Sequence, residues 1–416
     1  MTITRRVFLR NSALAVVGTA AVPSFLARAA WGTALSGART KRLVVMFQRG
    51  AADGLNIVVP HAEPQYYAMR PSINIPRKAV IDLDGFFGLH PSLAPFQPLW
   101  QQRQLAIVHA AGSPDPTRSH FDAQDFMEAG TPGLKATEDG WLNRSLHNLP
   151  PPAQAQRSPF QAIAMGPSIP RILSGLEPAI AMNNINDFSV GGRNPKPSPA
   201  ATAFEAMYNH SLDTVLHGTG EETFDAVKML KSADPSKYMP APGADYPKAR
   251  FGDSLRQLAQ LIKANLGVQV AFADIGGWDH HVNEGSVDGQ IANVLRDFSQ
   301  SIAAFWTDLG DLGEDTVVVT MSEFGRTARE NGNRGTDHGH ANVMFVLGGP
   351  VKGGRVYGRW PGLEQSQLYE GRDLALTTDF RQVIGEAVAR HMGNENLKDV
   401  FPGYENQPGK FLRLLG

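Results

Sequence analysis

The chain alternates short apolar runs with longer segments in which apolar residues recur every three or four positions. A short run that is apolar almost throughout is typical of a strand buried on both faces of a sheet. The runs of this kind are residues 43–47, 105–108, 268–273, 316–320 and 343–347. We therefore expect a strand at each of these positions.

The segments with helical spacing predict amphipathic helices between these strands. We expect helices at residues 120–129, 253–266, 286–309 and 379–391. Ser119 is placed to cap the first of them, with Asp122 three residues later as in a capping box. Asp253 is placed to cap the second, and Gly267 to end it.

Alternating strands and helices predict an α/β fold, doubly wound, with a mostly parallel sheet and helices on both faces. We assign residues 31–416 to a single domain of this kind. Residues 150–250 are rich in proline and have only patchy periodicity, so we interpret them as an insertion or cap. Within it, residues 199–216 are a candidate helix, with Ser198 as its cap.

The first thirty residues have the features of an export signal. Arg5 and Arg6 are followed by an apolar run over residues 12–26, and Ala27-Arg28-Ala29 has the shape of a cleavage site. The paired arginines resemble a twin-arginine signal, which predicts the twin-arginine translocase as a partner and a periplasmic or secreted mature protein. The run is too short and too weakly apolar for a membrane span, and an amphipathic helix is the alternative.

Composition narrows the class of protein. Hydrophobic residues make up 42% of the chain and charged residues 19%, as in a globular protein. The formal charge of −1 argues against a nucleic-acid binder. Because the chain has no cysteine, any metal site must use histidine, carboxylate, hydroxyl or backbone ligands.

Polar residues gather where the predicted strands end, which is where open α/β sheets bind ligands. Asp53 follows the first strand in a glycine-flanked turn, and it is either a ligand or a turn aspartate bonded to its own backbone. Ser119 is either only a helix cap or also a nucleophile, if a nearby metal lowers the pKa of its hydroxyl. His120 is a second candidate there, with a surface or core histidine as the alternative.

The later strand ends carry a denser set of candidate metal ligands. Asp279 and His281 lie two residues apart in a glycine-led loop, with Asp274 as an alternative ligand from the same strand. Glu323 follows the next strand and is either a ligand or a salt-bridge partner of Arg326. The last candidates are Asp337, His338 and His340. Oxygen and nitrogen ligands of this kind suit zinc, manganese or iron.

Several segments resemble, in order and spacing, the bacterial domain-of-unknown-function family numbered 1501. These segments are residues 49–56, 119–124, 277–281, 322–327 and 335–339. The resemblance implies an alkaline-phosphatase-like fold in a branch of the alkaline phosphatase and sulfatase superfamily. It implies a fold more firmly than a reaction.

The resemblance also implies roles for individual residues. Asp53 is similar to an aspartate ligand of one metal, and Ser119 to the metal-bound nucleophile. Asp279 and His281 look like ligands of a second metal, Glu323 like a further carboxylate ligand, and His338 like a last histidine just before an edge strand. Glu323-Phe324 stands where the superfamily has Asp-His, and the spacing from Asp279 to His281 is shorter than usual. These two departures leave open whether the site binds one metal ion or two.

These observations lead to the hypothesis of an exported hydrolase of phosphate or sulfate esters. Its substrate is a small anionic ester, its cofactor one or two divalent ions, and Ser119 attacks while Arg118 or Arg326 holds an anionic oxygen. The alternative is a non-catalytic metal- or carbohydrate-binding protein on the same scaffold. A weaker alternative is an assembly partner of a co-exported system.

Overall fold

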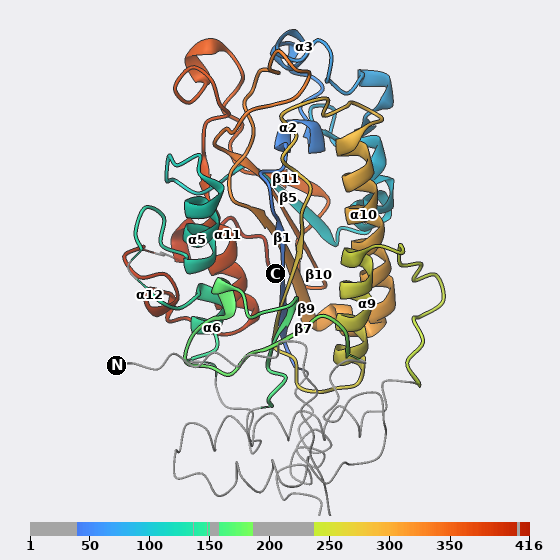
Figure 1. Ribbon diagram of the computed structural model, residues 1–416, viewed down its shortest axis with the longest axis vertical. Coiled ribbons are helices and arrows are strands. Elements are labelled where there is room, and N and C mark those ends of the chain that lie inside the picture. The colour runs from blue at the N-terminus through green and yellow to red at the C-terminus, as the bar shows by residue number, and fades with distance from the viewer. Residues whose placement is uncertain (1–39, 136, 148, 150–157, 186–236, 406–407) are drawn as a thin grey trace, which may run out of the picture.

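The computed structural model describes residues 40–135, 137–147, 149, 158–185, 237–405 and 408–416 of the 416-residue chain. Within these residues, a nine-stranded sheet forms the centre of the molecule (Figure 1), in the order β11-β5-β10-β9-β1-β8-β6-β7 with β12 paired to β5. Its strands are β1 (Arg42–Gln48), β5 (Leu105–Gly112), β6 (Ala162–Met165), β7 (Ile180–Met182), β8 (Val270–Ile275), β9 (Thr316–Ser322), β10 (Asn342–Gly348), β11 (Arg355–Tyr357) and β12 (Thr378–Asp379). A small second sheet contains β2 (Val58–Val59), β3 (Ile81–Asp82) and β4 (Gly88–Leu89).

Helices cover both faces of the large sheet, as the sequence predicted. On one side lie α9 (Arg250–Lys263) and α10 (Gln290–Leu309), and on the other lie α5 (His120–Ala129), α6 (Trp141–Arg144), α11 (Phe380–Glu386) and α12 (Leu397–Val400) (Figure 1). The remaining α-helices described are α2 (Gly54–Ile57), α3 (Pro64–Met69) and α4 (Gln97–Gln101). Short 3-10 helices occupy Arg77–Ala79, Pro91–Phe96, Arg171–Leu173, Gly310–Asp315, Gln365–Gln367 and Pro408–Lys410.

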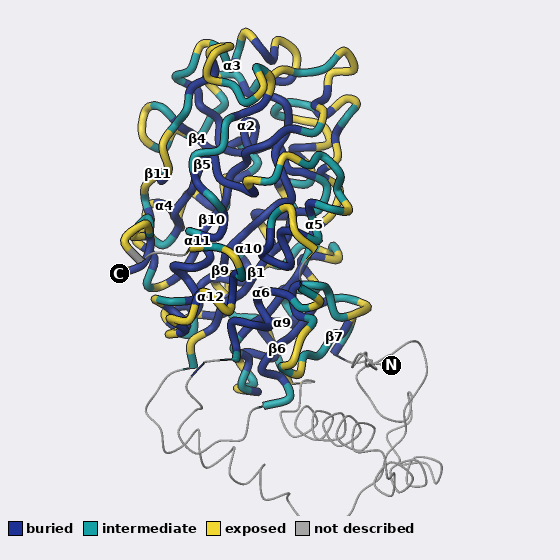
Figure 2. The backbone as a smooth tube through the Cα atoms, turned by 90° about the vertical axis from the view of Figure 1, so that its left-hand side faces the viewer, coloured by how far each residue is buried: buried dark blue, intermediate teal, exposed yellow. Residues whose placement is uncertain are grey.

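The alternation of side chains along β1 divides the core into two layers. Val44 and Met46 pack with α9 and α10, whereas Val45 and Phe47 pack with α6, α11 and α12. Successive residues of a strand point to opposite faces, so a run without polar residues must be covered on both sides. Figure 2 shows the resulting buried interior along the strands.

The α/β fold class is confirmed, and the sheet is mostly parallel. β1 pairs in parallel with β8 and β9, and β6 pairs in parallel with β7 and β8. β10 runs antiparallel to both of its neighbours, β5 and β9. The strand after His338 is therefore internal, whereas the resemblance had implied an edge strand at this position. Because β5 and β9 are both antiparallel to β10, β5 runs in the same direction as β9 and β1.

Within the described residues, the predicted strands and the helices predicted at 120–129, 253–266, 286–309 and 379–391 are present, most of them with shifted ends. Ser119 caps α5 as predicted, its hydroxyl accepting from the amide of Asp122 at 3.5 Å. Asp253 does not cap α9, which begins three residues earlier with Ala249 at the cap position, so Asp253 lies in the first turn. α10 begins at Gln290, because the φ of 104° at the preceding Gly289 lies outside the helical range. The closing helix is α11, capped by Asp379 and continued by a π-helical turn over Ala387–His391.

The expected insertion at 150–250 is only partly described. Residues 162–182 form β6 and β7 and extend the main sheet beyond β8. The candidate helix at 199–216 lies outside the described residues, and so does the export signal at 1–30. The cap and the domain boundaries thus stay predictions. Among the residues that are described, none of the helices combines the length and the apolar character that a membrane span requires.

Candidate metal centre

Five neighbouring strands bring the candidate residues to one edge of the sheet. The carboxyl ends of β1, β5, β8 and β9 meet there, and so does the beginning of the antiparallel strand β10. His120 begins the helix after β5, Asp279 and His281 follow β8, and His338 precedes β10. The sheet topology therefore gathers residues that are up to 218 positions apart in the chain.

Four side-chain atoms converge at this edge. The Nε2 atom of His338 lies 3.0 Å from His120 Nε2 and 3.0 Å from His281 Nε2. Asp279 Oδ1 lies 2.9 Å from His281 Nε2, 3.5 Å from His338 Nε2 and 3.7 Å from His120 Nε2. Two ligands of an ion in a tetrahedral site, each about 2.1 Å from it, lie about 3.4 Å apart, which is close to these five separations. The ligand atoms of His120, Asp279 and His338 all lie within 4.8 Å of one another, so these three could hold a metal ion, and His281 contacts two of them.

Each of the three imidazoles is oriented through its other nitrogen. The Nδ1 atom of His120 lies 2.8 Å from Glu323 Oε1, that of His281 lies 3.0 Å from Asp337 Oδ1, and that of His338 lies 2.8 Å from the carbonyl oxygen of Arg118. Ionised carboxylates and carbonyls only accept, so each Nδ1 carries the hydrogen and each Nε2 presents a lone pair. Metal-binding histidines are held in this way. Three lone pairs and a carboxylate facing one another favour a bound cation.

Glu323 supports His120 from a fully buried position. Its Oε1 atom also accepts from Gln124 Nε2 at 2.8 Å and from the amide of Gly50 at 2.8 Å. Burial opposes its ionisation, but the hydrogen bonds from His120 and Gln124 hold the pKa of Glu323 below its ordinary value. The same hydrogen bond raises the pKa of His120. Glu323 thus lies behind a histidine, whereas the sequence predicted it among the ligands.

The loop after β1 approaches the loop after β8 so closely that only glycine fits at the contact. Gly50 has a φ of 116°, and a Cβ atom there would lie 2.9 Å from the amide nitrogen of Asp279. The absence of a side chain lets the backbone of the loop after β1 reach both Asp279 and Glu323.

Arg326 is buried and holds the loops around the centre together. Its guanidinium donates to the carbonyl oxygens of Gly50, Ala51, Trp278 and Thr336 and to Asp279 Oδ1, the last at 2.6 Å. Partial burial acts to raise the pKa of Asp279, but the hydrogen bond and the charge of Arg326, together with the nearby His281 and His120, lower that pKa below its ordinary value. With its donors directed at protein groups, Arg326 orients a candidate ligand instead of facing the recess. Its predicted salt bridge is therefore to Asp279 and not to Glu323.

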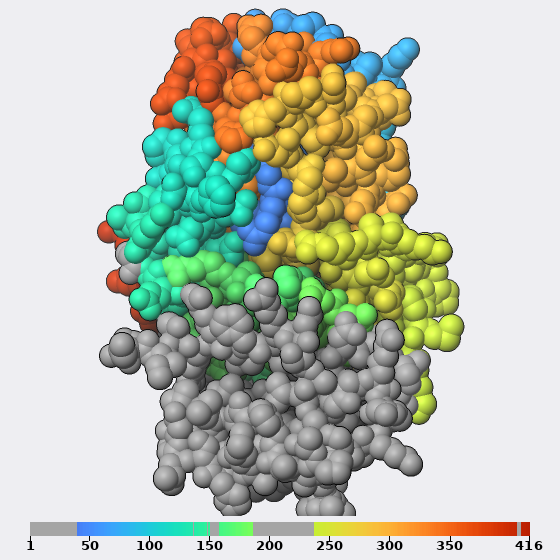
Figure 3. Space-filling view, in the orientation of Figure 1, coloured from blue at the N-terminus to red at the C-terminus, as the bar shows by residue number. Residues whose placement is uncertain are grey.

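The centre is open to solvent on one side. In the folded chain the side chains of His281 and Asp279 are 40% and 47% exposed to solvent. Figure 3 shows the blue segment that contains β1 at the floor of a recess, between the teal segment that contains α5 and the gold segment that follows β8. A small molecule can thus approach this end of the sheet.

Other residues predicted for the site have different surroundings. Asp53 is buried against the buried guanidinium of Arg70, which bonds both of its oxygens. The ring of His340 stacks on Tyr369 at 4.3 Å. Asp274, the alternative ligand, pairs with Arg49 at 2.7 Å. Asp337 approaches the centre only from behind His281.

Two further predicted residues flank His120 in the chain. Ser119 is the cap of α5, directly before it, and its hydroxyl accepts from the amide of Asp122. Arg118 donates from Nη2 to Glu370 at 2.6 Å and to Asp373 at 2.7 Å, while its carbonyl oxygen holds His338. His120 itself was only a second candidate in the sequence, because a lone histidine after a helix cap gives no spacing signal. Its one distinguishing feature was its place after a strand end.

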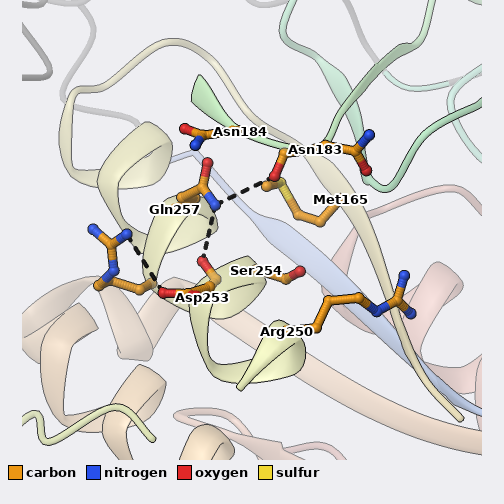
Figure 4. A pocket seen from close by; sticks show the side chains of 8 residues that line it. Met165, Asn183, Asn184, Arg250, Asp253, Ser254 and Gln257 are labelled. Carbon is orange, nitrogen blue, oxygen red and sulfur yellow. Dashed lines mark hydrogen bonds and ion pairs between the residues drawn. The ribbon is translucent and has the colours of Figure 1, made fainter. Parts of the chain in front are cut away.

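A separate hollow of about 220 Å³ lies beside α9 and the ends of β6 and β7 (Figure 4). It is lined by Met165, Asn183, Asn184, Arg250, Asp253, Ser254, Arg256 and Gln257. Its polar groups bond one another, as Gln257 does with the carbonyl oxygens of Asn183 and Asp253. None of the four converging residues lines it.

Comparison with known proteins gives a family and distant structural likenesses. The family model described as "Protein of unknown function (DUF1501)" matches residues 40–401. None of the curated proteins with which the sequence was compared matches it. Among solved structures, the chain is similar to the C-terminal periplasmic domain of EcEptC from Escherichia coli in complex with zinc, at 10% identity and a TM-score of 0.35, covering 76% of this chain and 74% of that one.

Two other solved structures show likeness of the same order. The PsFucS1 sulfatase from Pseudoalteromonas sp. has 12% identity and a TM-score of 0.38, with 91% of this chain and 73% of that one covered. A protein in the alkaline phosphatase superfamily from Vibrio parahaemolyticus has 11% identity and a TM-score of 0.32, with 77% and 63% covered. At similarity this low, no activity or ligand is transferred from these proteins to this chain.

Proposed function

The chain belongs to the DUF1501 family, and we propose that it is a metal-dependent hydrolase of phosphate or sulfate esters. The observation that supports this most is the convergence of three imidazole nitrogens and one carboxylate oxygen at a solvent-open edge of the sheet. The proposed ligands are His120, His281, His338 and Asp279. Imidazole with carboxylate suits zinc, manganese or iron.

One ion per chain accounts for this set of ligands. Asp53, the candidate for a second ion, already has its charge balanced by Arg70 in a buried ion pair. His340 is likewise engaged, by its stacking on Tyr369. We therefore propose a single ion, with Asp53 and His340 in structural roles.

Ser119 remains the proposed nucleophile because of its place at the start of α5. A helix N-terminus favours an anionic group, and Ser119 directly precedes His120 in the chain. A bound divalent ion there supplies the Lewis acidity that lowers the pKa of a hydroxyl. The Ser119 oxygen bonds to phosphorus or sulfur, the bond to the ester oxygen breaks, and the alcohol leaves with a proton. Water then releases the phosphate or sulfate and restores Ser119.

Arg118 and Arg326 were predicted to hold an anionic oxygen. In the structure Arg326 donates to four carbonyls and Asp279, and Arg118 to two carboxylates. We propose instead that both act on the ligands: Arg326 orients Asp279, and the Arg118 carbonyl orients His338.

We propose export by the twin-arginine route and a periplasmic or secreted mature protein. The support is the signal-like sequence of residues 1–30, with Arg5 and Arg6 at its head. Replacing both arginines with lysine is expected to keep the chain in the cytoplasm. Export of that variant at the wild-type level would contradict the proposed route.

The function is tested on the mature protein, purified without chelator. We expect about one equivalent of a transition metal, and turnover of an aryl phosphate or aryl sulfate that chelator abolishes and one divalent ion restores. His338→Ala should lose the metal, and Ser119→Ala should keep it while losing turnover. A metal-free wild type after incubation with zinc, manganese and iron would contradict the centre. Unchanged turnover in Ser119→Ala would contradict the nucleophile.

A non-catalytic metal-binding or carbohydrate-binding role is the second candidate, and one observation favours it. Four proposed protein ligands would fill a four-coordinate site, as in structural zinc sites, whereas catalytic sites keep a position for water. Bound metal without turnover of any ester in the panel, with the metal resistant to exchange, would support this role over hydrolysis.

A further inference from the structure

The loop at residues 369–373 packs against the segment that carries His338. Asp373 lies in this loop with a fully buried side chain. Its backbone is anchored twice: the amide of Tyr369 donates to the carbonyl oxygen of Asp373 at 2.8 Å, and Asp373 forms a β-bridge with Thr327, shortly after β9. Asp373 is thus a fixed point next to the centre.

The carboxylate of Asp373 joins two arginines. Arg118 donates from Nη2 to Oδ2 at 2.7 Å, and Arg372 donates from Nε to Oδ1 at 2.8 Å. The carboxylate thus compensates the charge of both guanidinium groups. Hydrogen bonds between charged groups of this kind are short and strong, so the three side chains act as one unit.

Both arginines lead to the same histidine. His338 donates from Nδ1 to the carbonyl oxygen of Arg118 at 2.8 Å, and Arg372 donates from Nη2 to the carbonyl oxygen of His338. The contacts form a closed ring from the His338 imidazole through Arg118, Asp373 and Arg372 to the His338 backbone. One arm of the ring orients the imidazole, and the other holds the main chain.

We propose that Asp373 is a positioning residue for His338 and so controls the metal affinity of the centre. This inference rests on the proposed metal centre. His120 and His281 each have a carboxylate directly at Nδ1, whereas His338 has only a carbonyl there. Asp373 supplies the missing carboxylate one step further away, by fixing the residue that carries this carbonyl.

The test is a zinc dissociation constant, measured by chelator competition on the mature protein. Partners behind metal-binding histidines typically change metal affinity by about 10–100-fold. Because Asp373 acts through an intermediate residue, we expect Asp373→Asn to weaken zinc binding about tenfold. Arg372→Gln, which removes the arm to the His338 backbone and one partner of Asp373 but keeps the arm through Arg118, should weaken it severalfold, and Arg372→Lys should restore part of the loss.

Glu370→Gln is the matched control. Glu370 also accepts from Arg118 Nη2, at 2.6 Å, but its side chain is 53% exposed and is outside the ring. Its replacement should change the zinc dissociation constant less than about twofold, because exposed ion pairs contribute little.

The free energy of unfolding of the zinc-free variants shows whether a change in zinc affinity comes from lost positioning of His338 or from lower stability of the fold. Lower stability of Asp373→Asn with an unchanged zinc dissociation constant would overturn the inference, and so would equal effects of Asp373→Asn and Glu370→Gln on zinc binding. If Asp373→Asn does not fold, wild-type zinc affinity in Arg372→Gln overturns it instead. A wild type that binds no zinc, manganese or iron contradicts the proposed function itself and, with it, the premise of this inference.

Discussion

His120 and His338 face each other through two nitrogen atoms that both present lone pairs, 3.0 Å apart. Their Nδ1 hydrogens are committed to Glu323 and to the carbonyl oxygen of Arg118. Two lone pairs at this distance repel unless a proton or a metal ion lies between them. Burial lowers the pKa of His338, whereas the hydrogen bond to Glu323 raises that of His120. The metal ion proposed for this centre would lie between the two nitrogens and accept both lone pairs.

Glu323→Gln is expected to weaken metal binding about tenfold or more. The amide keeps the shape but loses the charge that raises the basicity of His120. Asp337→Asn makes the same change behind His281, where the carboxylate is 55% exposed and screened by water, so its effect should be smaller. Chelator competition on both variants checks the order, and a larger effect of Asp337→Asn would contradict it.

Asp53→Asn is expected to lower stability and leave the metal content unchanged. Arg70 is fully buried and donates to both Asp53 oxygens, so removing the charge leaves the guanidinium poorly compensated. Breaking a buried ion pair typically costs about 3–5 kcal/mol. Denaturant unfolding measures the cost, and elemental analysis measures the ion. Loss of the metal with little loss of stability would make Asp53 a ligand.

Glu284→Gln is expected to remove part of the pH dependence of stability in the metal-free chain. Burial, and then the charge of Asp53, raise the pKa of Glu284 well above its ordinary value. The folded state therefore holds a proton that the unfolded state releases above about pH 4.3, so stability falls as the pH rises toward the folded pKa.

The slope contributed by this one proton is at most about 1.4 kcal/mol per pH unit. Glutamine mimics the protonated acid and carries no slope, so the variant should gain stability relative to wild type between pH 5 and pH 8. Urea unfolding at both pH values provides the comparison. Parallel pH profiles for the two proteins would show that Glu284 is ionised in the folded chain.

His340→Phe is expected to retain the metal, in contrast to His338→Phe. The His340 ring stacks on Tyr369, with the ring planes 22° apart, and phenylalanine preserves that packing. Metal content of the two variants, purified side by side, decides between the histidines. A His340→Phe variant that contains no metal would place His340 among the ligands.

The sequence by itself determined the strands, the helices and the edge of the sheet at which the candidate functional residues lie. A strand buried on both faces must be apolar throughout, so β1 and β9 were visible in the runs 43–47 and 316–320. The cap at Ser119 was visible because capping depends on adjacent residues. Local patterns of this kind survive folding with shifts of a few residues.

Only the tertiary structure decided which polar residue meets which. Asp53 and Asp279 look alike in the sequence, each in a glycine-flanked loop after a strand, but Arg70 neutralises the first and Arg326 turns the second toward three histidines. His120 joins the centre because β10 runs antiparallel between β5 and β9 and brings His338 to the same edge. Pairing between residues more than two hundred positions apart depends on strand order, and no local spacing in the sequence encodes that order.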